Sequence, residues 1–169
     1  LSIIHLDPSK PKLAPKALSG SSKNALLKKP EGIKPFPNND LVVLPARGLI
    51  NKRYGDAAGF GNTSRGITII TRERAQIVAP HDGKVVFAGS FRRYGKILII
   101  QHGGGYHTVL AGLAEIKCIV GQWLLAGEPV GFMGTNKVEE TTLYLELRRN
   151  GQPINPSPWM MANGEKVRG

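Results

Sequence analysis

From residue 41 to the C-terminus, short apolar segments alternate with glycine-containing turns, and this alternation restricts the fold more than any other feature. The segments are rich in Val, Ile, Leu and Tyr, which favour the pleated surface of a strand. No sustained helical period occurs in this part of the chain. Many short strands at close spacing predict an all-β fold, either an antiparallel β-sandwich or a partly open barrel. The predicted strands are Ile67–Thr71, Gln76–Ala79, Lys84–Ala88, Lys96–Gln101, Tyr106–Ala111, Pro129–Met133 and Thr142–Arg148.

Residues 1–40 differ in composition from the rest of the chain. They contain six prolines, seven lysines and a Ser-Gly-Ser-Ser stretch at 19–22. Proline removes backbone donors, and Ser and Gly raise the entropic cost of ordering. We therefore expect a Pro/Lys-rich flexible linker or regulatory arm at 1–40 and one domain at 41–169. Within the arm, Ser22–Lys29 is a short helix candidate, with Ser22 as its cap.

Charge and cysteine usage narrow the function classes. The net charge is +11, and it is spread along the chain: sixteen basic residues face nine acidic ones in 41–169. Such a balance favours anionic partners, but no helix carries a basic stripe with interleaved aromatics, so nucleic-acid binding is not predicted. Cys118 is the only cysteine, which excludes an internal disulfide and a cysteine-rich metal site. Its apolar neighbours indicate a core position.

A series of short motifs, taken in order, resembles the LytM (lysostaphin-type) family of zinc metallopeptidases over residues 45–159. Each motif alone has little specificity, but their order and spacing together are specific to the family. The motifs are Arg65-Gly66-Ile67, Val78-Ala79-Pro80, Asp82-Gly83-Lys84-Val85, Tyr94-Gly95, His102-Gly103-Gly104-Gly105-Tyr106, Val120-Gly121-Gln122, Ala126-Gly127, Leu145-Glu146-Leu147-Arg148 and Gly151-Gln152-Pro153-Ile154-Asn155-Pro156.

The resemblance also shows which residues are missing. Active members bind zinc through a His and an Asp four residues apart and through the second His of a His-x-His pair. Two further histidines assist catalysis: the first His of that pair and one after the central hairpin. The corresponding positions in this chain are Ser64, Thr68, Thr142, Tyr144 and Gly112. Neutral hydroxyls are poor zinc ligands, so we expect no metal cofactor and no hydrolysis by the chain itself.

No other set of residues replaces this site. The four histidines are not spaced as metal ligands, and no Ser-His-Asp arrangement has the context of an activated nucleophile. His81 is interpreted as a polar turn residue and His102 as structural. His107 lies near the lost catalytic position, where a hydrogen-bonded strand histidine is the expected state.

Within the family, this chain resembles the EnvC-type murein hydrolase activators, which are degenerate members. Three features carry the resemblance: Thr142–Leu147 with Tyr144 at a zinc-ligand position, the following Arg148-Arg149, and the closing Asn155-Pro156-Ser157-Pro158-Trp159. The resemblance implies a non-catalytic activator of periplasmic N-acetylmuramoyl-L-alanine amidases, which binds the amidase through the metal-free groove during cell division. It also implies a link to a membrane division complex through a coiled coil upstream of Leu1, and peptidoglycan contact is a further possibility. In activators of this kind an upstream helix covers the groove, a role for which Ser22–Lys29 is the candidate.

Four residues are predicted to bind the partner: Arg65, Tyr94, Tyr144 and Arg148. Thr142, Tyr144, Glu146 and Arg148 alternate along one strand and should share a face, with the intervening leucines in the core. Tyr and Arg are frequent interface hot spots. The alternative is that Tyr144 only fills the metal cavity and Arg148 is a solvated charge at the end of the strand.

Two other functions remain open at this point. A peptidoglycan-binding scaffold would explain the positive charge and would bind cell wall without affecting a hydrolase. An active zinc endopeptidase would need unusual ligands. The basic segment Arg92-Arg93-Tyr94-Gly95-Lys96 is expected to be a hairpin tip, which could contact an acidic partner or an anionic glycan.

Overall fold

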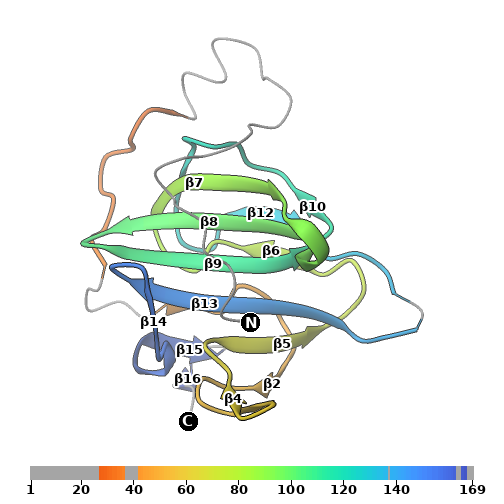
Figure 1. Ribbon diagram of the computed structural model, residues 1–169. Helices are drawn as coiled ribbons and strands as arrows, with labels where there is room; N and C mark the ends of the chain where they lie inside the picture. Colours follow the sequence, from red (N-terminus) through yellow and green to blue (C-terminus); the bar gives the residue numbers. More distant parts are fainter. Residues whose placement is uncertain (1–26, 37–41, 137, 163–164, 167–169) are drawn as a thin grey trace.

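The computed structural model describes residues 27–36, 42–136, 138–162 and 165–166 (Figure 1). All seven predicted strands are present, and each begins and ends within two residues of its predicted bounds. The all-β, mainly antiparallel prediction is therefore confirmed. The helix predicted at Ser22–Lys29 falls mostly outside the described residues. Among the described helices, none is long and apolar enough to span a membrane.

One large antiparallel sheet forms the centre of the molecule, with β14 paired to the outer part of β13. Consecutive hairpins place its long strands side by side (Figure 1). In spatial order the strands are β11 (Trp123–Leu124), β7 (Gly83–Ser90), β8 (Lys96–Gly103), β9 (Tyr106–Leu113), β13 (Thr141–Arg149), β5 (Ile67–Thr71) and β2 (Leu49–Lys52), with β14 at Gln152–Ile154.

Three smaller sheets and two 3-10 turns complete the described fold. The sheet β10-β12-β6 packs on one face of the large sheet, while β1 runs parallel to β15. Their bounds are β10 (Glu115–Ile116), β12 (Pro129–Phe132), β6 (Gln76–Val78), β1 (Val42–Val43), β15 (Met160–Ala162), β16 (Glu165–Lys166), β3 (Ala57–Gly59) and β4 (Asn62–Thr63), with turns η1 (Arg92–Tyr94) and η2 (Ser157–Trp159).

The main core lies between the large sheet and the β10-β12-β6 sheet. Leu143 and Leu145 of β13 point into it together with Ile77 of β6 and Val130 of β12. Tyr144 belongs to a second apolar cluster on the opposite face of the large sheet. Side chains alternate between the two faces of a strand, so the sequence pattern of β13 determines which residues enter which cluster. Cys118 is buried in the main core, as predicted, and burial raises the pKa of its thiol to about 12.

Residues 27–36 lie against one end of the domain. The Lys29 ammonium sits 5.3 Å from the centre of the Trp123 ring, and the Lys34 amide donates to the Asp82 carboxylate at 3.1 Å. Phe36 is 5% exposed and packs edge-on against His81 at 5.0 Å between ring centres. His81 lies in a turn, as predicted, and the packing of the distant Phe36 against it accompanies its burial at 3% exposure.

His102 joins the turn at Asp82 to Thr108 of β9, as its structural interpretation predicted. Its ring nitrogens lie 2.8 Å from the Asp82 carbonyl and 2.6 Å from the Thr108 hydroxyl. A neutral ring satisfies both groups if Nδ1–H donates to the carbonyl and Nε2 accepts from the hydroxyl. Burial is the main cause that lowers the pKa of His102 to about 4, and His81 and His107 add to it.

We expect the free energy of unfolding to fall as the pH drops from about 6.5 to about 4. Over this range the unfolded chain takes up a proton at His102 that the folded chain binds poorly, so acid favours unfolding. The expected loss is about 3 kcal/mol. Urea titrations between pH 4 and 7 measure it, and His102→Gln should flatten the slope. An unchanged slope in that variant would show that other groups control the acid response.

Candidate functional site

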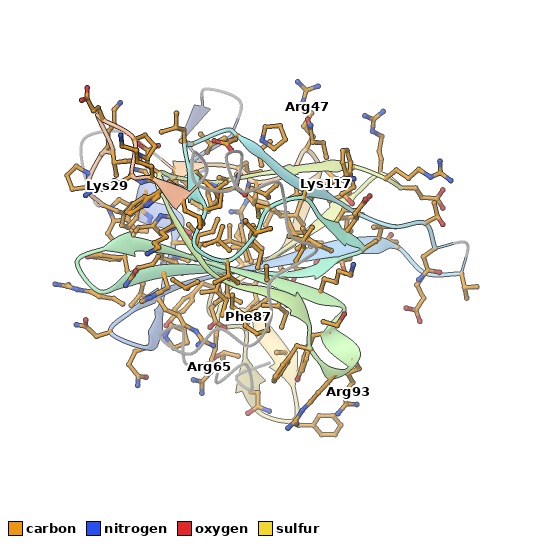
Figure 2. All side chains as sticks on the ribbon, turned by 90° about the horizontal axis from the view of Figure 1, so that it is seen from above. Lys29, Arg47, Arg65, Phe87, Arg93 and Lys117 are labelled. Atoms are coloured by element: carbon orange, nitrogen blue, oxygen red, sulfur yellow. The ribbon has the colours of Figure 1, made fainter. Side chains whose placement is uncertain are left out.

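The candidate site lies on the face of the large sheet that points away from the β10-β12-β6 layer. Strand pairing places Tyr144 of β13 opposite Thr68 of β5 on one side and Ala111 of β9 on the other. Phe87 and Arg65 lie on this side of the sheet, whereas Arg47 and Lys117 lie on the other side (Figure 2). Thr68 and Tyr144, two of the positions that the resemblance aligns with zinc ligands, are thus neighbours on one surface.

Three side chains of β13 form a buried hydrogen-bonded chain on this face. The Tyr144 hydroxyl donates to Glu146 Oε1 at 2.7 Å, and Arg148 Nε donates to Glu146 Oε2. Glu146 is completely buried, and the side chains at both ends are nearly so, with Tyr144 8% and Arg148 7% exposed. The alternation predicted for this strand is confirmed. The alternative interpretation of Arg148 as a solvated charge is wrong, because Arg148 is paired and buried.

An apolar floor surrounds the Tyr144 ring. The cluster consists of Tyr144 with Phe87, Ile97, Ile99, Val109 and Ala111, and Tyr94 packs against it from the β7–β8 turn. Burial is the main cause that raises the pKa of Tyr144, and the Glu146 carboxylate adds to it. The phenol therefore remains neutral and acts as a hydrogen-bond donor.

The Ser64–Gly66 segment borders this floor. The Ser64 hydroxyl donates to the Gly66 carbonyl at 2.8 Å. A Cβ on Gly66 would lie 2.2 Å from the Leu145 carbonyl oxygen and 3.0 Å from Tyr144 Cζ, so the backbone passes directly against β13 and the tyrosine ring. Arg65, between these two residues, is exposed to solvent. Its positive charge partly opposes the rise in the pKa of the Tyr144 hydroxyl that burial causes.

Gly112 occupies a bulge in β9, and the backbone there leaves no room for a side chain. Its φ is +104°, and a Cβ would lie 2.7 Å from the Thr142 carbonyl oxygen. The pairing with β8 shifts register at this point, between Ala111 and Leu113. The position that the resemblance aligns with a catalytic imidazole therefore has no room for a side chain.

The residues present do not fit the zinc ion that the resemblance implies. Catalytic zinc is held by thiolate, imidazole or carboxylate groups. The hydroxyls of Ser64 and Tyr144 are instead donors to Gly66 and Glu146. Within the described residues, no group of three His, Cys, Asp or Glu side chains is placed to hold a metal. No catalytic step through a metal can be derived for this arrangement.

The four predicted site residues occupy different depths. Tyr144 lies in the apolar floor and is joined through Glu146 to the buried Arg148, while Tyr94 is half-buried and Arg65 is exposed. Tyr94 stacks on Phe91 at 6.1 Å between ring centres, within a β7–β8 turn that carries Arg92 and Arg93. The hairpin tip predicted for this basic segment is confirmed. Thr142 is exposed at the start of β13.

Sequence reasoning missed the role of two residues. Glu146 was placed on the correct face, but nothing in the sequence indicated that it joins Tyr144 to Arg148. His107, paired with Arg148 across β9 and β13, was expected to be hydrogen-bonded on the strand. That expectation was wrong for Nε2, which is buried without a hydrogen-bond partner among the described residues. Burial is the main cause that lowers the pKa of His107, and Arg148 adds to it.

Comparison with known proteins identifies the family. The model of peptidase family M23 matches residues 62–156. The murein hydrolase activator EnvC of Escherichia coli (strain K12) is 31% identical over 117 residues, which are 69% of this chain and 28% of that protein. The murein hydrolase activator NlpD of the same organism is 33% identical over 113 residues, which are 66% of this chain and 29% of that protein.

The matched region therefore spans less than a third of each of these curated relatives. The solved structure of Helicobacter pylori Csd3 shares the fold, with a TM-score of 0.63 and 20% identity over 77% of this chain and 37% of that chain. The resemblance seen in the sequence motifs is confirmed. On the strength of the matched residues and the shared fold, the chain belongs to peptidase family M23.

Proposed function

We propose that this chain is a non-catalytic activator of peptidoglycan hydrolases, and specifically of N-acetylmuramoyl-L-alanine amidases in the periplasm. The observation that carries the proposal is the chemistry of the former metal site: Ser64, Thr68 and Tyr144 supply hydroxyls, and two of these are engaged as donors within the protein. The names of the relatives EnvC and NlpD support the activating role. A link to a membrane division complex through an upstream coiled coil belongs to the same proposal.

The binding surface in this proposal is the face built by Arg65, Tyr94, Tyr144 and Arg148. Arg65 and Tyr94 are accessible and make the direct contacts. Tyr144 belongs to the apolar floor, and Glu146 joins it to the buried Arg148. Rim charges such as Arg65 mainly accelerate association with an acidic partner and make it sensitive to salt.

The test is release of dye from labelled peptidoglycan by the chain, by an amidase from the same organism, and by both together. We expect release only from the mixture, and Arg65→Glu should lower it roughly tenfold at sub-saturating concentrations. Arg47→Glu is the matched control, since it makes the same charge change at an exposed residue on the opposite side of the sheet (Figure 2). Release by the chain alone that a chelator abolishes would contradict the proposal.

A passive peptidoglycan-binding scaffold is the second candidate, favoured by the net charge of +11. It predicts sedimentation with purified cell wall that weakens strongly with salt, and no stimulation of any amidase. In that case Arg65→Glu and Arg47→Glu should weaken binding to similar extents, because a diffuse charge effect does not depend on which face carries the residue.

A further inference from the structure

The β3–β4 hairpin carries a fully exposed aromatic side chain at its tip. Phe60 has a relative exposure of 104%, and both strands of the hairpin are exposed throughout. The hairpin pairs with no other strand among the described residues and lies at the edge of the fold, near β2 (Figure 1). A large exposed apolar side chain contributes nothing to the stability of the domain.

The backbone of this tip is also unfavourable for phenylalanine. Phe60 has φ +55° and is flanked by Gly59 at +86° and Gly61 at +77°. Glycine, and to a lesser degree asparagine, are the residues that adopt this left-handed conformation easily. Phe60 thus combines backbone strain with full exposure of an aromatic ring. Strain of this kind is often associated with function.

The base of the hairpin is attached to the candidate site. The Gly55 amide donates to the Ser64 carbonyl at 2.8 Å, and the Ser64 amide donates to the Asp56 carbonyl at 2.7 Å. The hydroxyl of the same Ser64 donates to the carbonyl of Gly66, which lies against the Tyr144 ring. The hairpin is therefore joined at its base to the Ser64–Gly66 segment that carries Arg65, and one partner can contact both.

The charge around this hairpin is mainly positive. Lys52 and Arg53 precede it and Arg65 follows it, against the single carboxylate of Asp56. That carboxylate is engaged locally, since it accepts from the Arg53 amide at 2.8 Å. An exposed aromatic ring on a hairpin with basic residues at its base complements an apolar pocket with acidic groups beside it. Aromatic anchors that fill such pockets supply much of the affinity in protein interfaces.

We propose that Phe60 is an anchor that inserts into an apolar, acid-rimmed pocket on the hydrolase that this chain activates. The inference rests on the proposed function and adds to it a second contact, separate from the floor around Tyr144. It assigns the β3–β4 hairpin to partner selection: a hydrolase without the pocket would bind weakly, even if it fits the floor.

Phe60→Asn tests the anchor without disturbing the fold, because asparagine accepts a positive φ. Val138→Asn is the control, since Val138 is 91% exposed in the β12–β13 loop and loses a comparable apolar side chain. The amidases of the organism that encodes the chain are purified, and their Kd values for the wild-type and variant chains are measured. We expect Phe60→Asn to weaken binding about tenfold or more and Val138→Asn to change it by less than about twofold. The Tm of Phe60→Asn should be no lower than that of the wild type.

The outcomes separate the anchor from the proposed function. If the wild type binds and stimulates an amidase and Phe60→Asn binds equally well, the proposed anchor role of Phe60 is wrong and the activator role stands. If no amidase binds the wild type, both fail. If Phe60→Asn loses only binding to phosphatidylglycerol vesicles, the tip is a lipid contact and the inference is overturned. A photo-crosslinking amino acid at position 60 should capture the amidase, whereas the same group at position 138 should not.

Discussion

Replacing Arg148 with methionine should lower the free energy of unfolding by about 3–5 kcal/mol. The substitution leaves the Glu146 carboxylate completely buried, with the Tyr144 hydroxyl as its remaining donor on β13. Removing one member of a buried ion pair is costly because the other charge keeps its desolvation penalty without its partner. Urea denaturation monitored by circular dichroism measures the loss.

Arg149→Met is the matched control for this prediction. Arg149 is the next residue of β13, and it is exposed, with its guanidinium 5.3 Å from the centre of the Tyr106 ring. An exposed cation–π contact contributes about 0.5–1 kcal/mol, so the control should lose no more than that. In the double variant Glu146→Gln/Arg148→Met most of the stability should return. Equal losses for Arg148→Met and Arg149→Met would show that the Glu146–Arg148 pair does not support the floor of the site.

A methyl group at Gly112 should lower the free energy of unfolding by about 2–5 kcal/mol. The expected loss combines about 1–2 kcal/mol for a positive φ in a non-glycine residue with about 1–3 kcal/mol for overpacking. The added carbon would lie 2.7 Å from the Thr142 carbonyl oxygen, and both neighbours are backbone in paired strands. Thermal and urea unfolding of Gly112→Ala measure the effect.

Gly127→Ala separates the two causes. Gly127 also has a positive φ, +82°, but a Cβ there would meet nothing within 4 Å. It should therefore lose only the conformational cost of about 1–2 kcal/mol. If the two variants were equally stable, the backbone around Gly112 would be free to move aside. The bulge would then not be what keeps an imidazole out of this position.

The strand pattern could be predicted well because it depends on local chemistry. Successive side chains of a strand point to opposite faces, and this geometry is independent of the rest of the fold. The pattern of β13 therefore placed Leu143 and Leu145 in the core and Tyr144 and Glu146 on the other face, as the structure shows. The motif order likewise identified the family over the residues that the family model matches.

Burial on the site face could not be predicted in the same way. Arg148 is a common interface residue type, but β9 and the Glu146 carboxylate place it in a nearly buried floor. His81 was interpreted only as a polar turn residue, and its burial depends on Phe36, 45 residues earlier in the chain, which packs against it. In both cases the exposure of a side chain depends on segments far away in the sequence, whose positions only the folded chain establishes.

The amino-acid sequence by itself determined the all-β class, the face to which each β13 residue points and the hydroxyl side chains of Ser64, Thr68 and Tyr144, at the positions that the resemblance aligns with zinc ligands. These properties follow from residue type and from the two-residue period of a strand. Only the tertiary structure decided that Tyr144, Glu146 and Arg148 form one buried hydrogen-bonded chain, that the backbone closes the Gly112 position and that Phe60 stands exposed on a hairpin joined to Ser64. These properties are contacts between segments, and a contact exists only once the packing of both partners is established.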